Sequence, residues 1–234
     1  LVAGSEHAAR PVAVEVASNG QQFSTSGVRF VHNAPPVVSA FYPERGPQTG
    51  STVVRILGAN FGAGVHFMCR FDGVAVDASY DEANSTMHCA SVPRATARAA
   101  PLEVSLNSQQ YTTPAVSFTW YAPPTVRLVT PDAGPVGGNT TVRLFGEGLD
   151  AGLDYYRCRF GGSVVVATAS GGTLLCTSPL LPFCSTSCKL HLSVTLNSQQ
   201  FSRPVSFVAY AEPKLTFVSP GLSLWAGRTE LNIS

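Results

Sequence analysis

The chain has 234 residues, of which 44% are hydrophobic and 12% are charged, with 21 glycines and 17 prolines. Plentiful apolar residues and a net charge of +1 exclude a disordered chain, and the length leaves room for one or two domains. The chain has two lysines, scattered arginines and no apolar run of the ~18 residues that cross a membrane, which excludes a nucleic-acid partner and membrane insertion.

Residues 1–34 are predicted to be the C-terminal part of a repeat. They contain Val16-Ala-Ser-Asn-Gly-Gln-Gln-Phe23, which recurs as Val104-Ser-Leu-Asn-Ser-Gln-Gln-Tyr111 and as Val194-Thr-Leu-Asn-Ser-Gln-Gln-Phe201. The spacing of roughly 90 residues is that of a small domain rather than of a solenoid unit. Because the chain starts without an initiator methionine or a signal-peptide pattern, we expect an internal or processed segment.

Residues 35–122 are predicted to form one complete repeat, and their apolar residues alternate with polar ones. The alternating sets are Val65, Phe67, Cys69 and Phe71, then Leu102, Val104 and Leu106, then Val116, Phe118 and Trp120. A period of two is typical of half-buried strands. Glycine, proline, asparagine and serine separate these strands at short intervals, as in a β-sandwich.

Residues 123–211 are predicted to form a second complete repeat, and residues 212–234 the N-terminal part of a further one. Cys69-Arg-Phe71 recurs as Cys158-Arg-Phe160, and Leu190, Leu192, Val194 and Leu196 alternate again. No stretch has the 3.6-residue period of a helix. The sequence therefore predicts an all-β protein built from tandem sandwiches.

The cysteines indicate disulfides. They are Cys69, Cys89, Cys158, Cys176, Cys184 and Cys188. Repeat symmetry selects the pairs Cys69–Cys89, Cys158–Cys176 and Cys184–Cys188 from the 15 connectivities that six cysteines allow. Buried free thiols are the alternative, but even, repeat-related cysteines favour disulfides and an oxidising compartment.

No combination of residues points to catalysis. The sequence has no nucleophile elbow, phosphate loop, zinc-protease motif or dinucleotide fingerprint. Asp81-Glu82 is an isolated acidic pair, which we interpret as a solvated turn rather than as a catalytic dyad. We therefore predict that the protein is not an enzyme and has no cofactor.

Two places in the sequence carry residue types that bind metals. Cys184 and Cys188, or His88 beside its neighbouring cysteine, lack the four closely spaced ligands of a zinc site. Asp150 and Asp154 flank a glycine-rich loop, but Ca²⁺ needs six to eight oxygen ligands. We predict no metal site.

Three sequons predict N-linked glycans, at Asn84, Asn139 and Asn232. Asn139 is expected at the start of a strand and Asn84 in a loop. Glycans would also give a surface of low charge a source of solubility.

The repeated Asn-Ser-Gln-Gln segments are predicted to be tight turns, with the asparagine taking a positive φ. A repeated ligand-contact loop is the alternative. Among the aromatic residues, four are expected as surface groups, with packing of some of them at domain junctions as the alternative: Tyr155, Tyr156, Tyr210 and Trp225.

These motifs together resemble the IPT/TIG domain family, which are immunoglobulin-like sandwiches found in plexins, scatter-factor receptors and surface arrays. The residues that carry the resemblance are Pro36, Pro43-Glu-Arg-Gly-Pro47, Gly50 and Gly58-Ala-Asn-Phe61, then Pro124, Pro131-Asp-Ala-Gly-Pro135, Gly137-Gly138 and Gly146-Glu-Gly-Leu149. A third start at Pro213 and Pro220 lacks the Gly-Pro pair. The alanine- and proline-rich composition also resembles green-algal surface proteins, including the structural protein of ciliary mastigonemes.

Two functions follow from this resemblance. The first is a structural or adhesive segment of an extracellular or cell-surface protein, in which the repeats act as spacers. Its partners would be other protein chains, either through self-assembly or as neighbouring repeats of a longer chain. The second is a receptor ectodomain whose ligand-binding feature is the loop Pro182-Phe-Cys-Ser-Thr-Ser-Cys188, which the first complete repeat lacks. An intracellular nucleic-acid-binding domain conflicts with the charge, and nothing in the sequence tests an enzyme accessory domain.

Overall fold

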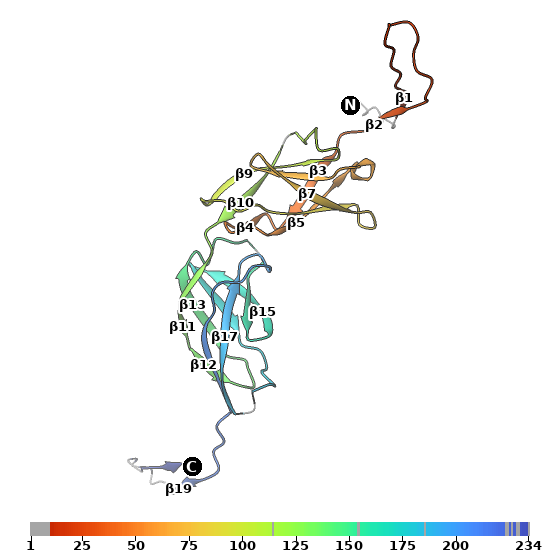
Figure 1. Ribbon diagram of the computed structural model, residues 1–234. Helices are drawn as coiled ribbons and strands as arrows, with labels where there is room; N and C mark the ends of the chain where they lie inside the picture. Colours follow the sequence, from red (N-terminus) through yellow and green to blue (C-terminus); the bar gives the residue numbers. More distant parts are fainter. Residues whose placement is uncertain are drawn as a thin grey trace, which may run out of the picture. The chain divides into compact units, whose positions relative to one another are not determined.

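The computed structural model divides the chain into two compact units, Leu1–Pro123 with Ala151–Tyr155, and Pro124–Asp150 with Tyr156–Ser234. The residues that it describes are 10–113, 115–153, 155–184, 186–222, 225, 227 and 230–233. Strands account for the regular structure of both units, apart from a 3-10 turn at Phe61–Ala63 (Figure 1). The prediction of an all-β protein is confirmed. No helix in the described part of the chain is long and apolar enough to span a membrane.

The first unit contains a two-layered sandwich. Its strands are β3 (Val37–Tyr42), β4 (Arg45–Pro47), β5 (Val53–Ala59), β6 (Met68–Phe71), β7 (Val74–Asp81), β8 (Thr86–Ala90), β9 (Arg98–Ser105) and β10 (Val116–Tyr121). One layer has the order β3-β5-β8-β7 and the other β7-β6-β9-β10-β4, because β7 pairs first with β6 and then with β8. All these pairs are antiparallel except β10 with β4.

The second unit repeats this topology. Its strands are β11 (Thr125–Thr130), β12 (Ala133–Pro135), β13 (Thr141–Glu147), β14 (Arg157–Phe160), β15 (Ser163–Ser170), β16 (Thr173–Thr177), β17 (Ser187–Thr195) and β18 (Val205–Tyr210). The layers are β11-β13-β16-β15 and β15-β14-β17-β18-β12, and β15 again passes from one layer to the other.

Alternation of apolar residues places one face of each strand in the core. In the first unit an aromatic cluster lies at its centre: the Phe118 ring is 4.8 Å from Trp120 and 5.4 Å from Phe71, each edge to face. The second unit keeps an equivalent pair, Phe160 and Phe207, at 5.2 Å. All five rings are at most 1% exposed, so these aromatic residues form the two cores.

The predicted strand from Val65 to Phe71 is shorter than the alternation suggests. Strand β6 begins at Met68, and Val65 is 75% exposed. The amides of Val65 and His66 both donate to the carbonyl oxygen of Leu106, at 3.0 Å each. Two amides that share one acceptor cannot continue a regular ladder, so the alternating pattern extends past the end of the strand.

The glycine that begins the repeated Gly-x-x-Phe or Gly-x-x-Leu segment allows a close approach of two strands. A Cβ atom on Gly58 would lie 1.9 Å from the carbonyl oxygen of Val37, and one on Gly146 would lie 1.8 Å from that of Thr125. These distances are far below any van der Waals contact. Glycine at this position therefore lets β5 and β13 pair closely with the edge strands β3 and β11.

Short hairpins flank the two sandwiches and repeat their register. Strand β1 (Arg10–Ala13) pairs with β2 (Arg29–His32), and β19 (Val218–Ser219) pairs with β20 (Asn232–Ile233). The same cross-strand pair recurs as Val12–Phe30, Ala100–Phe118 and Leu190–Phe207. The latter two phenylalanines are fully buried, whereas Phe30 is 55% exposed.

Candidate functional site

Each sandwich contains a disulfide between its two layers. Cys69 on β6 is bonded to Cys89 on β8, and Cys158 on β14 to Cys176 on β16, with Cα atoms 6.3 Å apart in both pairs. That separation lies within the usual range for a disulfide. All four residues are buried. In each sandwich the disulfide therefore links the same two layers that share one strand, β7 in the first sandwich and β15 in the second.

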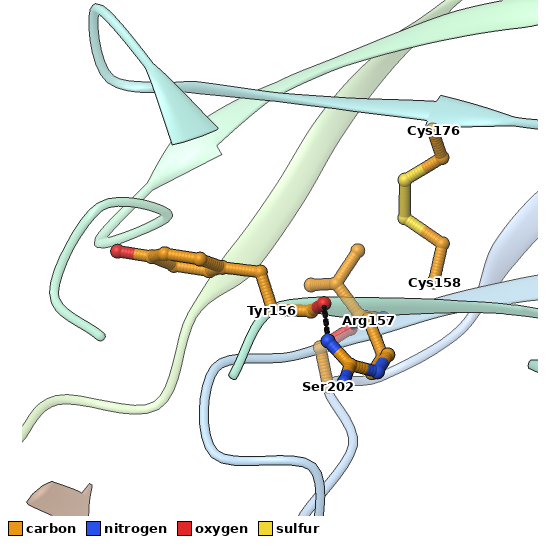
Figure 2. Close-up of a disulfide and its surroundings, with 6 residues drawn as sticks. Tyr156, Arg157, Cys158, Cys176 and Ser202 are labelled. Carbon is orange, nitrogen blue, oxygen red and sulfur yellow. Dashed lines mark hydrogen bonds between the residues drawn. A yellow bond between two sulfur atoms is a disulfide. The ribbon is translucent and has the colours of Figure 1, made fainter. Parts of the chain in front are cut away.

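The surroundings of the second bond are drawn in Figure 2. Tyr156 precedes β14 and directs its ring away from the sulfur atoms, while the Arg157 guanidinium donates to the Tyr156 carbonyl oxygen at 2.8 Å. The prediction of Tyr156 as a surface residue is wrong, because it is 7% exposed and its hydroxyl donates to the carbonyl oxygen of Asp150 at 3.2 Å. Tyr155, Tyr210 and Trp225 are exposed.

A third disulfide joins Cys184 to Cys188, with Cα atoms 5.9 Å apart. Cys184 is 4% exposed, and its sulfur lies 3.9 Å from the carbonyl oxygen of Ala209. Cys188 is opposite Ala209 in the ladder of β17 and β18. This bond therefore fixes the loop before β17 against the end of the second sandwich.

The first sequon lies in the turn between β7 and β8, where Asn84 is exposed. The Asn84 side-chain amide donates to an Asp81 carboxylate oxygen at 2.6 Å, and the Ala83 and Asn84 backbone amides donate to the other oxygen. These hydrogen bonds, the side-chain one first, lower the pKa of Asp81. Asp81 fits the predicted solvated turn, because its carboxylate accepts hydrogen bonds from residues of the same loop.

Replacing Asn84 by Ala should raise the pKa of Asp81 toward its ordinary value. The substitution removes the largest cause of the lowered pKa and leaves the two backbone donors. Because the folded-state pKa is depressed, the stabilisation is present above the unfolded-state pKa and is lost as the pH falls through the folded one. An NMR titration of the Asp81 carboxyl carbon measures this pKa. Asn139→Ala is the control, and an unchanged Asp81 pKa in Asn84→Ala would contradict the assignment.

The other two sequons are also at the surface. Asn139 is exposed with a φ of 62° and donates its backbone amide to the Ser178 carbonyl oxygen at 2.8 Å. It lies in the turn before β13, which begins at Thr141, two residues later than the strand start at Asn139 that the sequence predicts. Asn232 is exposed on β20, and the last residue of its sequon, Ser234, lies outside the described residues. Glycosylation at the three asparagines remains a prediction.

The repeated asparagine organises its turn through its side chain rather than through its own φ. In all three copies its carboxamide oxygen accepts the backbone amides two and three residues later, at 3.0–3.2 Å, and its NH₂ donates to the second glutamine: Asn19 with Gln22, Asn107 with Gln110, and Asn197 with Gln200. The positive φ belongs to the next residue, at Gly20, Ser108 and Ser198. The prediction of positive φ at asparagine is therefore wrong, and the internal bonds account for the repeated Asn and Gln.

An arginine stacks on the aromatic residue that ends each complete turn segment. The Arg70 guanidinium carbon lies 3.9 Å from the centre of the Tyr111 ring, and that of Arg159 lies 4.1 Å from the Phe201 ring. Arg70 also makes a bidentate pair with Glu103, at 2.6 and 2.8 Å, which raises the arginine pKa. In the repeated Cys-Arg-Phe motif, the cysteine thus forms the disulfide between the layers, the arginine stacks on an aromatic ring of the turn segment, and the phenylalanine lies in the core.

Within the part of the chain that the structure describes, no group of three or more His, Cys, Asp or Glu side chains is arranged to hold a metal ion. Asp154, one of the two aspartates that flank the glycine-rich loop, lies outside that part.

Both complete repeats match a known domain family. The sequence model of the IPT/TIG domain matches residues 36–120 and 124–209. Plexin A3 of Danio rerio is 23% identical over 222 residues, covering 89% of this chain and 11% of that protein. A solved structure of the full extracellular region of plexin A4 has a TM-score of 0.58 at 20% identity, covering 79% of this chain and 17% of that one. The chain spans a small part of both relatives, and this likeness shows the fold.

Proposed function

The chain belongs to the IPT/TIG domain family, and from this premise we propose that it is a non-catalytic structural or adhesive segment of an extracellular protein. The observation that carries the proposal is the disulfide between the two layers of both sandwiches, Cys69–Cys89 and Cys158–Cys176. Disulfides form and persist in oxidising compartments. The matched plexin A4 structure is itself an extracellular region.

The terminal hairpins support a longer array. The hairpin of β1 and β2 has the register of β9 with β10, and β19 with β20 has that of β11 with β13. Their apolar residues, such as Phe30 and Phe217, are largely exposed, whereas Phe118 is buried within its complete repeat. We propose that residues 1–34 and 212–234 are parts of neighbouring repeats, whose remaining strands would cover these side chains.

In such an array the repeats act as spacers and offer lateral surfaces to other protein chains. Among the described strands, β3 and β11 lie at the edges of their layers, and an edge strand is a surface for pairing unless glycans or charges cover it. Glycans on Asn84 and Asn139 would shield parts of both sandwiches. The alanine- and proline-rich composition supports one specific location for such an array, a filament on the surface of a cilium.

Peptide mapping of the native-source protein without reduction tests this proposal. We expect three linked pairs, Cys69–Cys89, Cys158–Cys176 and Cys184–Cys188, together with sugar on Asn84 or Asn139. Free thiols and bare sequons would overturn the extracellular assignment, because disulfides and N-linked glycans are the marks of the secretory route.

One observation favours a ligand-binding receptor ectodomain as the second candidate. In the loop region before β17, Leu180 and Phe183 are 64% and 58% exposed, and Phe183 directly precedes the disulfide-bonded Cys184 in the chain. Exposed apolar groups of this kind mark interaction sites when they are clustered. Binding to ligand-bearing cells that survives Leu180→Ser/Phe183→Ser would contradict this candidate.

A further inference from the structure

The outer face of one layer in the second repeat carries positive charge, and the described strands that form this face contribute no carboxylate. Residues paired across β14, β17 and β18 project to the same side, and so do their partners on β15. The charged or ionisable residues on this face are Arg157, Arg159, Lys189 and His191. No aspartate or glutamate occupies an outward position on these described strands. We call this surface the basic face.

The equivalent face of the first repeat is electrically balanced. Its charged residues on β4, β6, β7 and β9 are Arg45, Arg70, Asp77 and Glu103. The cross-strand partner of Arg70 is Glu103, whereas the partner of Arg159 is Ser193. Two further positions of the basic face carry uncharged residues in the first repeat, where Met68 replaces an arginine and Ala99 replaces a lysine. The same fold therefore exists with and without this charge.

A hollow of about 420 Å³ lies on the basic face. It is lined by Arg159, Gly161, Lys189, Leu190, His191, Ser193 and Pro204. The stack of Arg159 on Phe201 holds the guanidinium beside this hollow. Because Ser193 is too short to reach across as Glu103 does, the hollow lacks the carboxylate that the first repeat supplies.

Apolar side chains border the charges on both sides. On β15, Val164 and Val166 are 53% and 67% exposed, and on β18, Val208 and Tyr210 are 36% and 40% exposed. Their ladder partners, which include Arg159 and Lys189, place all four on the basic face. A carboxylate-rich chain with apolar side chains complements this arrangement, whereas a sulfated polysaccharide offers no groups for the apolar borders.

We propose that the basic face of the second repeat is a docking surface for an acidic polypeptide segment whose carboxylates alternate with apolar residues. A carboxylate of the partner takes the place beside Arg159 that Glu103 takes beside Arg70 in the first repeat. Lys189 and Arg157 pair with further carboxylates, and the valines contact the apolar side chains. This inference rests on the proposed role as a binding and spacer segment, and it names the chemistry of one partner.

Binding of a labelled, end-capped decapeptide of alternating Glu and Val to the full chain tests the proposal by fluorescence anisotropy. The matched variant is Arg157→Met/Lys189→Ala, which introduces the residues of the first repeat. We expect the double variant to weaken binding roughly fivefold, as two partly exposed ion pairs are lost. Binding should also weaken when the salt concentration is raised from about 50 to about 200 mM. The distance over which charges attract one another falls about threefold for each tenfold rise in salt concentration.

Three controls make the result decisive. Arg127→Ala removes a charge from the other layer of the same repeat and should leave binding unchanged. Equal affinity for a peptide with Gln in place of Glu, or unchanged binding by the double variant, would overturn the proposal. Binding of a heparin oligosaccharide but not of the acidic peptide would also overturn it and assign the face to a polysaccharide. Failure of the extracellular proposal is recognised separately, from the disulfide and glycan map.

Discussion

Replacing Trp120 by Ala should lower the free energy of unfolding of the first unit by about 3–5 kcal/mol, the cost of removing a large buried aromatic side chain. Trp120 is 1% exposed, and its ring lies 4.8 Å from Phe118 and 6.1 Å from Phe71. Its indole nitrogen donates to the Val92 carbonyl oxygen at 2.9 Å. The substitution leaves both a cavity and an unpaired buried acceptor.

Guanidinium denaturation followed by circular dichroism measures this loss. Trp225→Ala is the matched control because Trp225 is fully exposed, and a surface substitution of this kind changes stability by about 0.5 kcal/mol or less. A loss below about 1 kcal/mol for Trp120→Ala would show that the first core does not depend on this ring.

The second repeat shows how the same position is filled by other groups. Ala209 takes the place of Trp120, because each lies two ladder positions after the phenylalanine of its strand, Phe207 and Phe118 respectively. Leu181, fully buried, takes the place of Arg94, whose guanidinium lies 5.4 Å from the Trp120 ring. Their amides make equivalent bonds to Val136 and Gln48. A leucine and the Cys184–Cys188 bond thus replace a tryptophan and an arginine.

The sequence predicts the architecture well because each strand buries one face and the repeat occurs twice. Alternation locates strands β9, β10, β17 and β18, and repeat symmetry places Cys69 and Cys158 at equivalent positions. Alternation gives no information about where hydrogen bonding stops. For this reason the predicted strand extended to Val65, where two amides share the Leu106 carbonyl oxygen.

Local chemistry decided the remaining differences. Tyr156 precedes β14, and periodicity did not indicate that its hydroxyl would reach the Asp150 carbonyl oxygen. In the turns, asparagine accepts the later amides with its side chain, so the next residue, such as Ser108, takes the positive φ.

The basic face could not be predicted from composition, because the net charge of the chain is only +1. Its charge emerges from the register, which places residues distant in sequence, such as Arg157 and Lys189, on one side of a layer. A pairing shifted by one residue would turn these side chains to the opposite face.

Removing the Cys69–Cys89 bond by a double substitution to Ala should destabilise the first unit by about 3 kcal/mol. The bond spans 20 residues, and closing a loop of that length restricts the unfolded chain by this amount in the loop-entropy model. Both cysteines are buried between the layers, so the lost sulfur contacts act in the same direction. Calorimetry of the full chain measures the effect, and Cys158–Cys176 serves as an intact reference.

The matched comparison is Cys184→Ala/Cys188→Ala, whose bond spans only 4 residues. The same model gives about 2 kcal/mol for a loop this short. Equal losses for the two double variants would show that contacts of the sulfur atoms in the folded state, rather than loop closure, determine the stabilisation. A larger loss for Cys69→Ala/Cys89→Ala would instead identify the bond between layers as the main covalent constraint on the sandwich, because it restricts the longer segment of the unfolded chain.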